Sequence, residues 1–241
     1  MDAAAVAALA PSGTLRAAIN FGNPVLAQKD PASGEPRGVS AALARALAKR
    51  LDVPVAFVAF DGAGKVFEAL KAGAWDIAFL AIDPVRAAEI DFTSPYVIIE
   101  GAYAVPARSP LKAVGDVDAK GVRVAVAAGA AYDLHLTRAL KQATLVRAQS
   151  PEESAAMFLR DGLDVLAGVK QPLQAFVRAN PGLRLIDGRF MAIEQAMGTP
   201  RGRAAGAAFL RRFVEEMKAS GFVAQALKES GQGDATVAPA A

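Results

Sequence analysis

Short apolar runs typical of strands alternate with stretches in which apolar residues recur at helical spacing, and this alternation limits the folds open to the chain. Residues 14–19 and 53–60 are predicted strands, and residues 40–51 between them have the leucine spacing of one helix face. Residues 76–81 are nearly all apolar, as expected for a strand that is buried on both faces of a sheet. Strands and helices in alternation predict an α/β protein with a parallel sheet.

The same alternation begins again after residue 97. Further strands are predicted at residues 97–105, 122–126, 145–148, 163–167, 183–186 and 193–197. Further helices are predicted at residues 132–141, 151–159, 172–177 and 201–218, in addition to one at residues 66–72 in the first half of the chain. Residues 231–241 are rich in Gly, Ala and Pro, which predicts a frayed tail. No segment repeats at a fixed period, and the length favours one large or two small domains.

The composition excludes several classes of functional site. The 241 residues include no Cys and one His, which excludes disulfides, thiolate zinc sites, cysteine nucleophiles and multi-histidine metal sites. The net charge of +3 is too small to indicate nucleic-acid binding. No apolar run reaches the roughly 18 residues of a membrane span. We therefore expect a compact globular protein with no cofactor and no metal.

The first ten residues leave the cellular compartment open. They are apolar, but their first charge is Asp2 and the first basic residue is Arg16, whereas a secretory leader begins with a positive segment. We expect a periplasmic protein if a leader has been removed, and a cytoplasmic protein otherwise.

Three motifs in order carry a resemblance to a known family. They are ALKAGAWD at residues 69–76, DPVR at residues 83–86 and IDFTSPY at residues 90–96. With these spacings the chain resembles the bacterial solute-binding proteins of family 3, the polar amino-acid class, which show a helix-to-strand step, a TxxR segment and a dFSxPY crossover. The likeness extends over about residues 13–230.

The resemblance implies a two-lobed, periplasmic-binding-protein-like α/β fold in which two crossover strands join the lobes and the ligand cleft lies between them. Lobe 1 would comprise residues 1–99 and 190–241, and lobe 2 residues 100–189. Ligands of open parallel sheets bind beyond the carboxyl ends of the strands, which agrees with this expectation. Hinge closure around the ligand and a monomeric state are expected as well.

Arg86 is the main ligand-binding residue that the resemblance implies, because family members bind the ligand carboxylate with an Arg at this place. A guanidinium suits the task, since its planar donors match a carboxylate bidentately. Composition alone favours a surface residue paired with Asp83 or Glu89, whereas the motif context favours ligand contact. Phe79 and Ala81 occupy positions where relatives place hydroxyl groups, so only their main-chain donors would remain.

Gly129, Ala130, Ala131 and Tyr132 lie between a predicted strand and a predicted helix, where free N–H groups can bind an anion. The resemblance implies a second carboxylate contact at this turn. A simple strand-to-helix turn explains the same residues, and Asp133 also fits an acidic first-turn position.

Lys170 stands in a segment that departs from the family. Relatives place an Asp shortly after the segment matching residues 163–165, where it holds the α-ammonium group of the ligand, but here no acid follows until Asp187. Lys170 would favour a second negative group on the ligand, or it is a solvated cation. Glu100 and Glu194 lie on the two presumed crossovers, and each either replaces the missing acid or forms a hinge salt bridge.

Asn20, Phe21 and Asn23 follow the first predicted strand, where relatives line the pocket with an aromatic and polar groups. Phe21 would cover the ligand and the two asparagines would orient it. A turn beside Gly22 and Pro24 explains the asparagines equally well.

Three functions agree with these patterns. The first is a binding protein that captures a small anionic or zwitterionic ligand, an amino acid or a related organic acid, for the membrane permease of an ABC-type importer. The second is a cytoplasmic metabolite-binding or sensor relative. The third is an enzyme similar to cyclohexadienyl dehydratases, which would need a positioned general acid.

Overall fold

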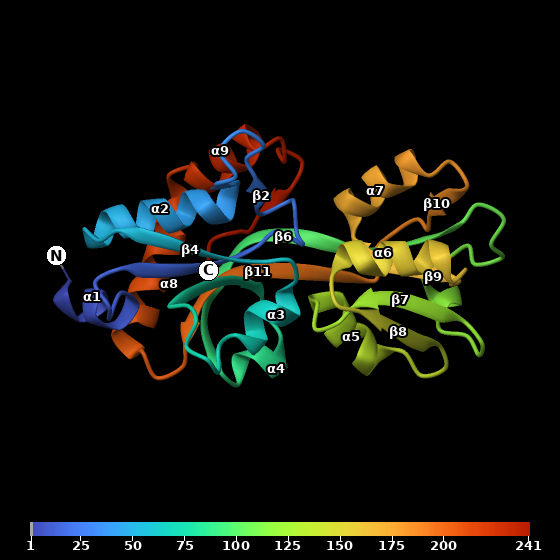
Figure 1. The fold of residues 1–241 in the computed structure, drawn as a ribbon, viewed down its shortest axis with the longest axis horizontal. Coiled ribbons are helices and arrows are strands. Elements are labelled where there is room, and N and C mark those ends of the chain that lie inside the picture. The colour runs from blue at the N-terminus through green and yellow to red at the C-terminus, as the bar shows by residue number, and fades with distance from the viewer. Residues whose placement is uncertain (1) are drawn as a thin grey trace. The chain divides into compact units, whose positions relative to one another are not determined.

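The computed structural model describes residues 2–241 and divides the chain into two compact units (Figure 1). Unit 1 comprises Met1–Phe60, Lys65–Ile98 and Glu194–Ala241, and unit 2 comprises Asp61–Gly64 and Ile99–Ile193. Two long strands contain unit boundaries, β6 (Ile90–Pro106) and β11 (Met191–Pro200). The chain therefore passes between the units within β6 and within β11, and also on either side of the short segment 61–64.

The sheet of unit 1 is built around β1 (Leu15–Asn20). Strands β4 (Val55–Phe60) and β5 (Ile77–Ala81) both run parallel to β1. Strand β11 pairs antiparallel with β5, so that Gln195 lies opposite Ala81. All five residues of β5 are buried, as its apolar sequence predicts. Three short strands complete the unit: β2 (Gln28–Lys29), β3 (Pro36–Arg37) and β12 (Thr236–Val237).

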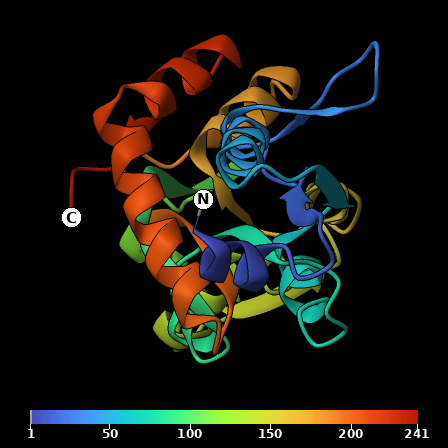
Figure 2. The same ribbon diagram turned by 90° about the vertical axis from the view of Figure 1, so that its left-hand side faces the viewer.

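Helices cover this sheet. Helix α2 (Val39–Leu51) packs against β1 and β4, and α9 (Phe222–Glu229) packs against α2 and α8 (Ala204–Ala219). Helix α1 (Ala3–Leu9) lies against α8 (Figure 2). The two remaining helices are α3 (Ala63–Glu68) and α4 (Pro84–Ala87). No helix between residues 2 and 241 is long and apolar enough to cross a membrane.

Glycine is required at the start of α2. Gly38 has φ +96°, a backbone conformation that L side chains rarely adopt, and an added Cβ would lie 2.7 Å from the carbonyl oxygen of Leu26. The chain can therefore turn into the helix here only because residue 38 has no side chain.

Unit 2 has a second parallel sheet with a core on each face. Strands β8 (Thr144–Ala148) and β9 (Val165–Val169) run parallel to β7 (Arg123–Ala127), and β9 and β10 (Leu183–Leu185) pair antiparallel with β6. One core packs the β7 side chains Val124 and Val126 against α5 (Ala131–Ala139), and the other packs Ala125 against α6 (Pro151–Arg160) and α7 (Lys170–Ala179). The short 3-10 helix Val114–Val117 precedes β7.

The structure corrects the expected frayed tail. Strand β12 pairs with β6, Ala238 is buried, and its N–H donates to the Tyr96 carbonyl at 3.1 Å. The ammonium of Lys218 also donates to the Pro239 carbonyl at 2.8 Å. Small residues therefore pack this segment onto unit 1. The sequence analysis also missed helices α1 and α9.

Candidate functional site

The predicted site residues of unit 1 gather at the carboxyl ends of its parallel strands. Strand β1 ends at Asn20 and β5 ends at Ala81. Six predicted residues lie on these two strands or shortly after them: Asn20, Phe21, Asn23, Phe79, Ala81 and Arg86. The carboxyl edge of a parallel sheet is where ligands of open α/β sheets bind. The topology thus brings residues far apart in the sequence to one edge.

Arg86 is fully buried in α4, so it is not the exposed surface arginine of the alternative interpretation. Its Nη1 donates to the carbonyl oxygen of Ala81 at 3.0 Å, which holds the guanidinium against the end of β5. Burial lowers the pKa of Arg86 to about 10, although the negative charge of Asp83 opposes this shift. Arg86 is therefore protonated at neutral pH. Asp83 caps α4 by accepting from the Val85 N–H at 2.9 Å.

Phe79 and Ala81 are both buried on β5. The Phe79 ring meets the Tyr96 ring edge to face, with 6.1 Å between the centroids. Glu194 lies beside them on β11, where its carbonyl accepts from the Ile82 N–H at 2.9 Å and its side chain is exposed. Unit 1 thus places Glu194 close to the end of the strand that leads to Arg86.

Asn20, Phe21 and Asn23 form a turn after β1. The Asn20 Oδ1 accepts from the Gly22 N–H at 2.9 Å, which is the turn role that the sequence also allowed. Asn23 is buried, and its Oδ1 has no hydrogen-bond partner within residues 2–241. Phe21 is half-buried. Asn23 thus retains an acceptor that no group in the described part of the chain uses.

The predicted anion-binding turn of unit 2 is engaged by its own chain. The Gly129 N–H donates to Oδ2 of Asp133 at 2.9 Å, and the Ala130 N–H donates to the Ala127 carbonyl at 3.1 Å. Asp133 is buried and also accepts from Nε of Arg147 at 2.9 Å. Ala131 and Tyr132 begin α5, and burial raises the pKa of the Tyr132 hydroxyl.

The segment 61–64 lies against this turn. An added Cβ on Gly64 would come within 2.5 Å of the Ala128 carbonyl oxygen, and one on Gly129 would come within 2.8 Å of the Gly64 Cα. Backbone therefore touches backbone at this position. The Gly129 turn is covered by protein and is a less open anion site than its sequence indicates.

Lys170, Glu100 and Arg189 form a charged cluster in unit 2. The Lys170 Nζ lies 2.7 Å from Oε2 of Glu100, and Nη1 of Arg189 lies 3.1 Å from Oε1. The hydrogen bond from Lys170 lowers the pKa of Glu100, and Arg189 adds to this shift. Lys170 directly follows β9, at the carboxyl edge of the parallel strands. The sequence analysis missed Arg189, which lies 89 positions from Glu100 and has no local signal.

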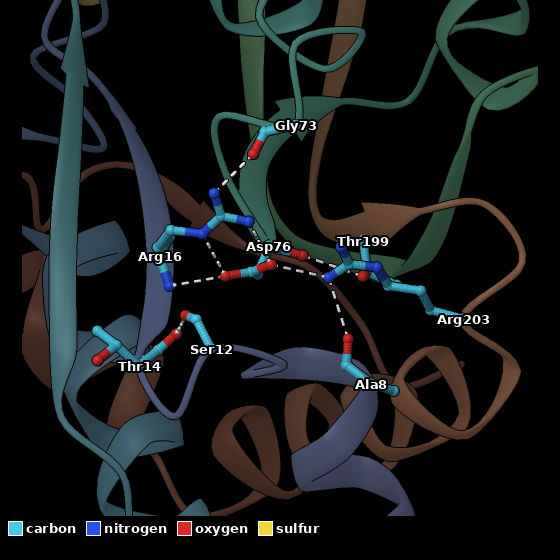
Figure 3. Close-up of polar contacts among 8 residues, drawn as sticks. All are labelled: Ala8, Ser12, Thr14, Arg16, Gly73, Asp76, Thr199 and Arg203. Atoms are coloured by element: carbon cyan, nitrogen blue, oxygen red, sulfur yellow. Dashed lines mark hydrogen bonds and ion pairs between the residues drawn. The ribbon is translucent and has the colours of Figure 1, made fainter.

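Asp76 belongs to a different cluster, at the amino ends of the strands of unit 1 (Figure 3). Its carboxylate accepts from the backbone N–H, Nε and Nη2 of Arg16 at 2.9–3.1 Å, and from Nη1 of Arg203 at 2.9 Å. Arg203 also donates to the Ala8 carbonyl, which ties α1 to the cluster. This cluster is structural, because it lies at the opposite edge from Arg86. Within residues 2–241, no group of three His, Cys, Asp or Glu side chains could hold a metal.

Solved structures share this fold. The solute receptors for L-cysteine of Neisseria gonorrhoeae superimpose with a TM-score of 0.81 at 23% identity, covering 93% of this chain and 92% of that chain. A mutant of ArgBP from T. maritima gives a TM-score of 0.80 at 20% identity, covering 94% and 99%. The ancestral amino acid-binding protein AncCDT-1, a precursor of cyclohexadienyl dehydratase, gives 0.75 at 22% identity, covering 91% and 95%.

These likenesses confirm the predicted periplasmic-binding-protein-like α/β fold. The comparison with curated protein sequences gave no match. Residues 15–231 match the family described as bacterial extracellular solute-binding proteins, family 3. This match includes both units and the three motifs that carried the resemblance. The chain therefore belongs to family 3 of the bacterial extracellular solute-binding proteins.

Proposed function

We propose that this protein binds a small carboxylate ligand, an amino acid or a related organic acid, and delivers it to an ABC-type importer. The observation that carries the proposal is Arg86: a charged guanidinium, fully buried, held at the carboxyl end of β5 by the Ala81 carbonyl. A family of extracellular binding proteins and amino-acid-binding structural neighbours support this function. The same family supports the periplasmic location that we propose. We also propose that the protein is a monomer, as expected from the sequence analysis.

A buried guanidinium is suited to recognising a carboxylate. Its planar donors match both carboxylate oxygens, and an ionic hydrogen bond is stronger where water is excluded. The Ala81 carbonyl fixes one arm of the group, so less conformational entropy is lost when a ligand binds. Phe79 and Ala81 lack hydroxyl groups, so the carboxylate would take its other donors from the main chain.

We further propose that the ligand is captured by hinge closure. The residues of the predicted site are divided between unit 1 and unit 2, and the chain passes between the units within β6 and β11. A ligand that engages both units favours the closed state by its differential affinity for that state. Bound ligand at about 100 times its dissociation constant adds about 2.7 kcal/mol of stability.

Binding is a better proposal than catalysis for this chain. A dehydratase-like elimination needs a general acid, whose pKa is typically raised toward the working pH. Of the two crossover acids, Glu100 has its pKa lowered by Lys170 and Arg189. Incubation with prephenate or arogenate should therefore yield no aromatic product.

The test of the binding proposal compares three proteins against a panel of amino acids and organic acids. We expect Arg86→Lys to weaken binding by tenfold or more, because a single ammonium cannot replace the bidentate fork, which is worth about 1.5–3 kcal/mol. Arg45→Lys is the matched control, since Arg45 also donates to a main-chain carbonyl, that of Pro36, and lies over the Phe57 ring.

Thermal unfolding and circular dichroism show whether the Arg86 variant is folded before its affinity is measured. Calorimetric titration then gives the affinity, and mass spectrometry identifies any ligand that copurifies. A folded Arg86→Lys protein that binds as tightly as the wild type would refute the role of Arg86. If no carboxylate in the panel stabilises the protein, the proposed function itself is refuted.

A further inference from the structure

A cluster of three charged side chains at the carboxyl edge of the unit 2 sheet has an excess of positive charge. Within residues 2–241, Lys170 and Arg189 share a single carboxylate, that of Glu100, and all three side chains are partly exposed. The cluster therefore has a net charge of +1. Since Lys170 is the first residue after β9, this charge lies at the edge of the sheet where a ligand is expected.

Two acids near this edge, Glu100 and Asp133, already have partners within unit 2. Glu100 is held by two cations, and Asp133 is buried against Arg147 and the Gly129 N–H. A ligand ammonium would have to displace a cation from one of these carboxylates. An anionic group on the ligand would instead approach Lys170 and Arg189, whose two positive charges are balanced within residues 2–241 only by the one negative charge of Glu100.

We propose that the ligand carries a second anionic group, which Lys170 and Arg189 bind beside Glu100, so that the preferred ligands are dicarboxylates rather than simple α-amino acids. This inference rests on the proposed carboxylate-binding function and specifies its ligand class. Glu100 has a defined part in it: it holds the two cations in place and reduces their charge. The ligand group approaches the donors of Lys170 and Arg189 that Glu100 leaves open to solvent.

The test uses sets of compounds with matched carbon chains: a dicarboxylate, a monocarboxylate and an α-amino acid of equal length. Succinate, glutarate and adipate are compared with butyrate, valerate and hexanoate, and with 2-aminobutyrate, norvaline and norleucine. Calorimetric titration or thermal shift measures each affinity. We expect at least one dicarboxylate to bind tenfold or more tightly than both of its partners, as charge-assisted hydrogen bonds predict.

Two variants of the cluster should act in opposite directions. Lys170→Gln removes one cation and should weaken dicarboxylate binding by about tenfold, with little effect on monocarboxylates. Glu100→Gln keeps an amide oxygen that can still accept from the cations but removes the competing negative charge, and should strengthen dicarboxylate binding. Lys120→Gln is the matched control: it makes the same charge change in unit 2, but Lys120 is exposed and precedes β7, at the amino edge of the sheet.

The outcomes separate this inference from the function on which it rests. Tighter binding of the amino acids, with affinity lost in Glu100→Gln, would overturn the inference, retain the binding function and identify Glu100 as an ammonium partner. If Lys170→Gln and Lys120→Gln weaken dicarboxylate binding equally, the inference is also overturned, because the net charge of the protein would then explain the effect without a specific site. If none of these acids and no other carboxylate binds, the proposed function fails as well.

Discussion

Replacing Asp76 by Asn should destabilise the protein far more than the same change at Asp164. The two carboxylates have the same kind of partner. In unit 1, Arg16 donates its N–H and Nε to Asp76 Oδ2 and its Nη1 to the Gly73 carbonyl. In unit 2, Arg123 donates its N–H and Nε to Asp164 and its Nη2 to the Gly162 carbonyl. The pair thus offers a control within one chain.

The expected magnitudes follow from burial. The Asp76 side chain is 0% exposed, whereas that of Asp164 is 40% exposed. Removing one partner of a buried ion pair costs about 3–5 kcal/mol, but Arg16 and Arg203 retain 34% and 26% exposure and can regain water. We therefore expect about 2–3 kcal/mol for Asp76→Asn and about 1 kcal/mol or less for Asp164→Asn.

Urea unfolding at neutral pH measures both variants. Circular dichroism follows the whole chain, and the fluorescence of the single Trp reports unit 1, because Trp75 is buried there and donates to the Val66 carbonyl at 2.9 Å. Shifts in the midpoint at constant slope give the change in free energy. The Asp76 variant should also melt several degrees lower, since about 1 kcal/mol shifts the midpoint by about 2–4 °C.

The pH dependence has a defined sign. Burial of Asp76 opposes its ionisation, but the hydrogen bonds from Arg16 and Arg203 outweigh burial and lower its pKa. The contribution of Asp76 to the free energy of unfolding is therefore complete above about pH 4, the pKa of an aspartate in the unfolded chain. It is lost as the pH falls through the lower pKa that Asp76 has in the folded protein. Equal destabilisation by the two variants at neutral pH, or a difference that grows toward low pH, would refute the reasoning.

Two further predictions concern the backbone of unit 1. Gly38→Ala should cost about 2–3 kcal/mol, because φ there is +96° and the Cβ would collide with the Leu26 carbonyl; Gly115→Ala, with no atom within 4 Å of its Cβ, should change stability by less than about 0.5 kcal/mol. Chemical denaturation measures both, and equal losses would contradict the steric argument. Deleting residues 235–241 removes β12 and the buried Ala238, and should cost about 1–2 kcal/mol in thermal unfolding; a truncated chain with an unchanged midpoint would show that the tail does not stabilise unit 1.

Local periodicity was enough to predict an α/β protein with parallel sheets, whereas the two-lobed arrangement was implied by the resemblance to family 3. The apolar run at residues 76–81 predicted a strand buried on both faces, and β5 is that strand. The alternation of strands with helices predicted parallel sheets, and β1, β4 and β5 form one of them. The resemblance to family 3 placed Asn20 and Arg86 in one ligand site, and in the structure both follow parallel strands at the carboxyl edge of the unit 1 sheet.

Contacts between distant residues could not be predicted in the same way. Arg189 and Glu100 are 89 positions apart, and Lys170 and Glu100 are 70 positions apart, so no local pattern connects them. The tail was predicted to fray because it is rich in Gly, Ala and Pro, yet small side chains let Ala238 pack closely. Asp133 fitted a first-turn residue, and only the fold shows that it is buried against Arg147.

Both units contain the same arrangement of contacts, in which one arginine donates to an aspartate carboxylate and to a glycine carbonyl. These stabilising contacts lie at the amino edge of each sheet, away from the carboxyl edge where we expect the ligand. In both units an arginine on the central strand ties down the residues that lead into the next parallel strand, at the amino edge of the sheet. The sequence showed no fixed repeat because the Arg–Asp separation is 60 residues in unit 1 and 41 in unit 2. At the amino edge, Asp164 accepts the main-chain and side-chain donors of Arg123, and the fully buried Asp76 accepts those of Arg16 together with Nη1 of Arg203, so these cations hold the fold together. At the carboxyl edge of unit 2, two cations share one carboxylate, and the surplus charge favours a ligand anion.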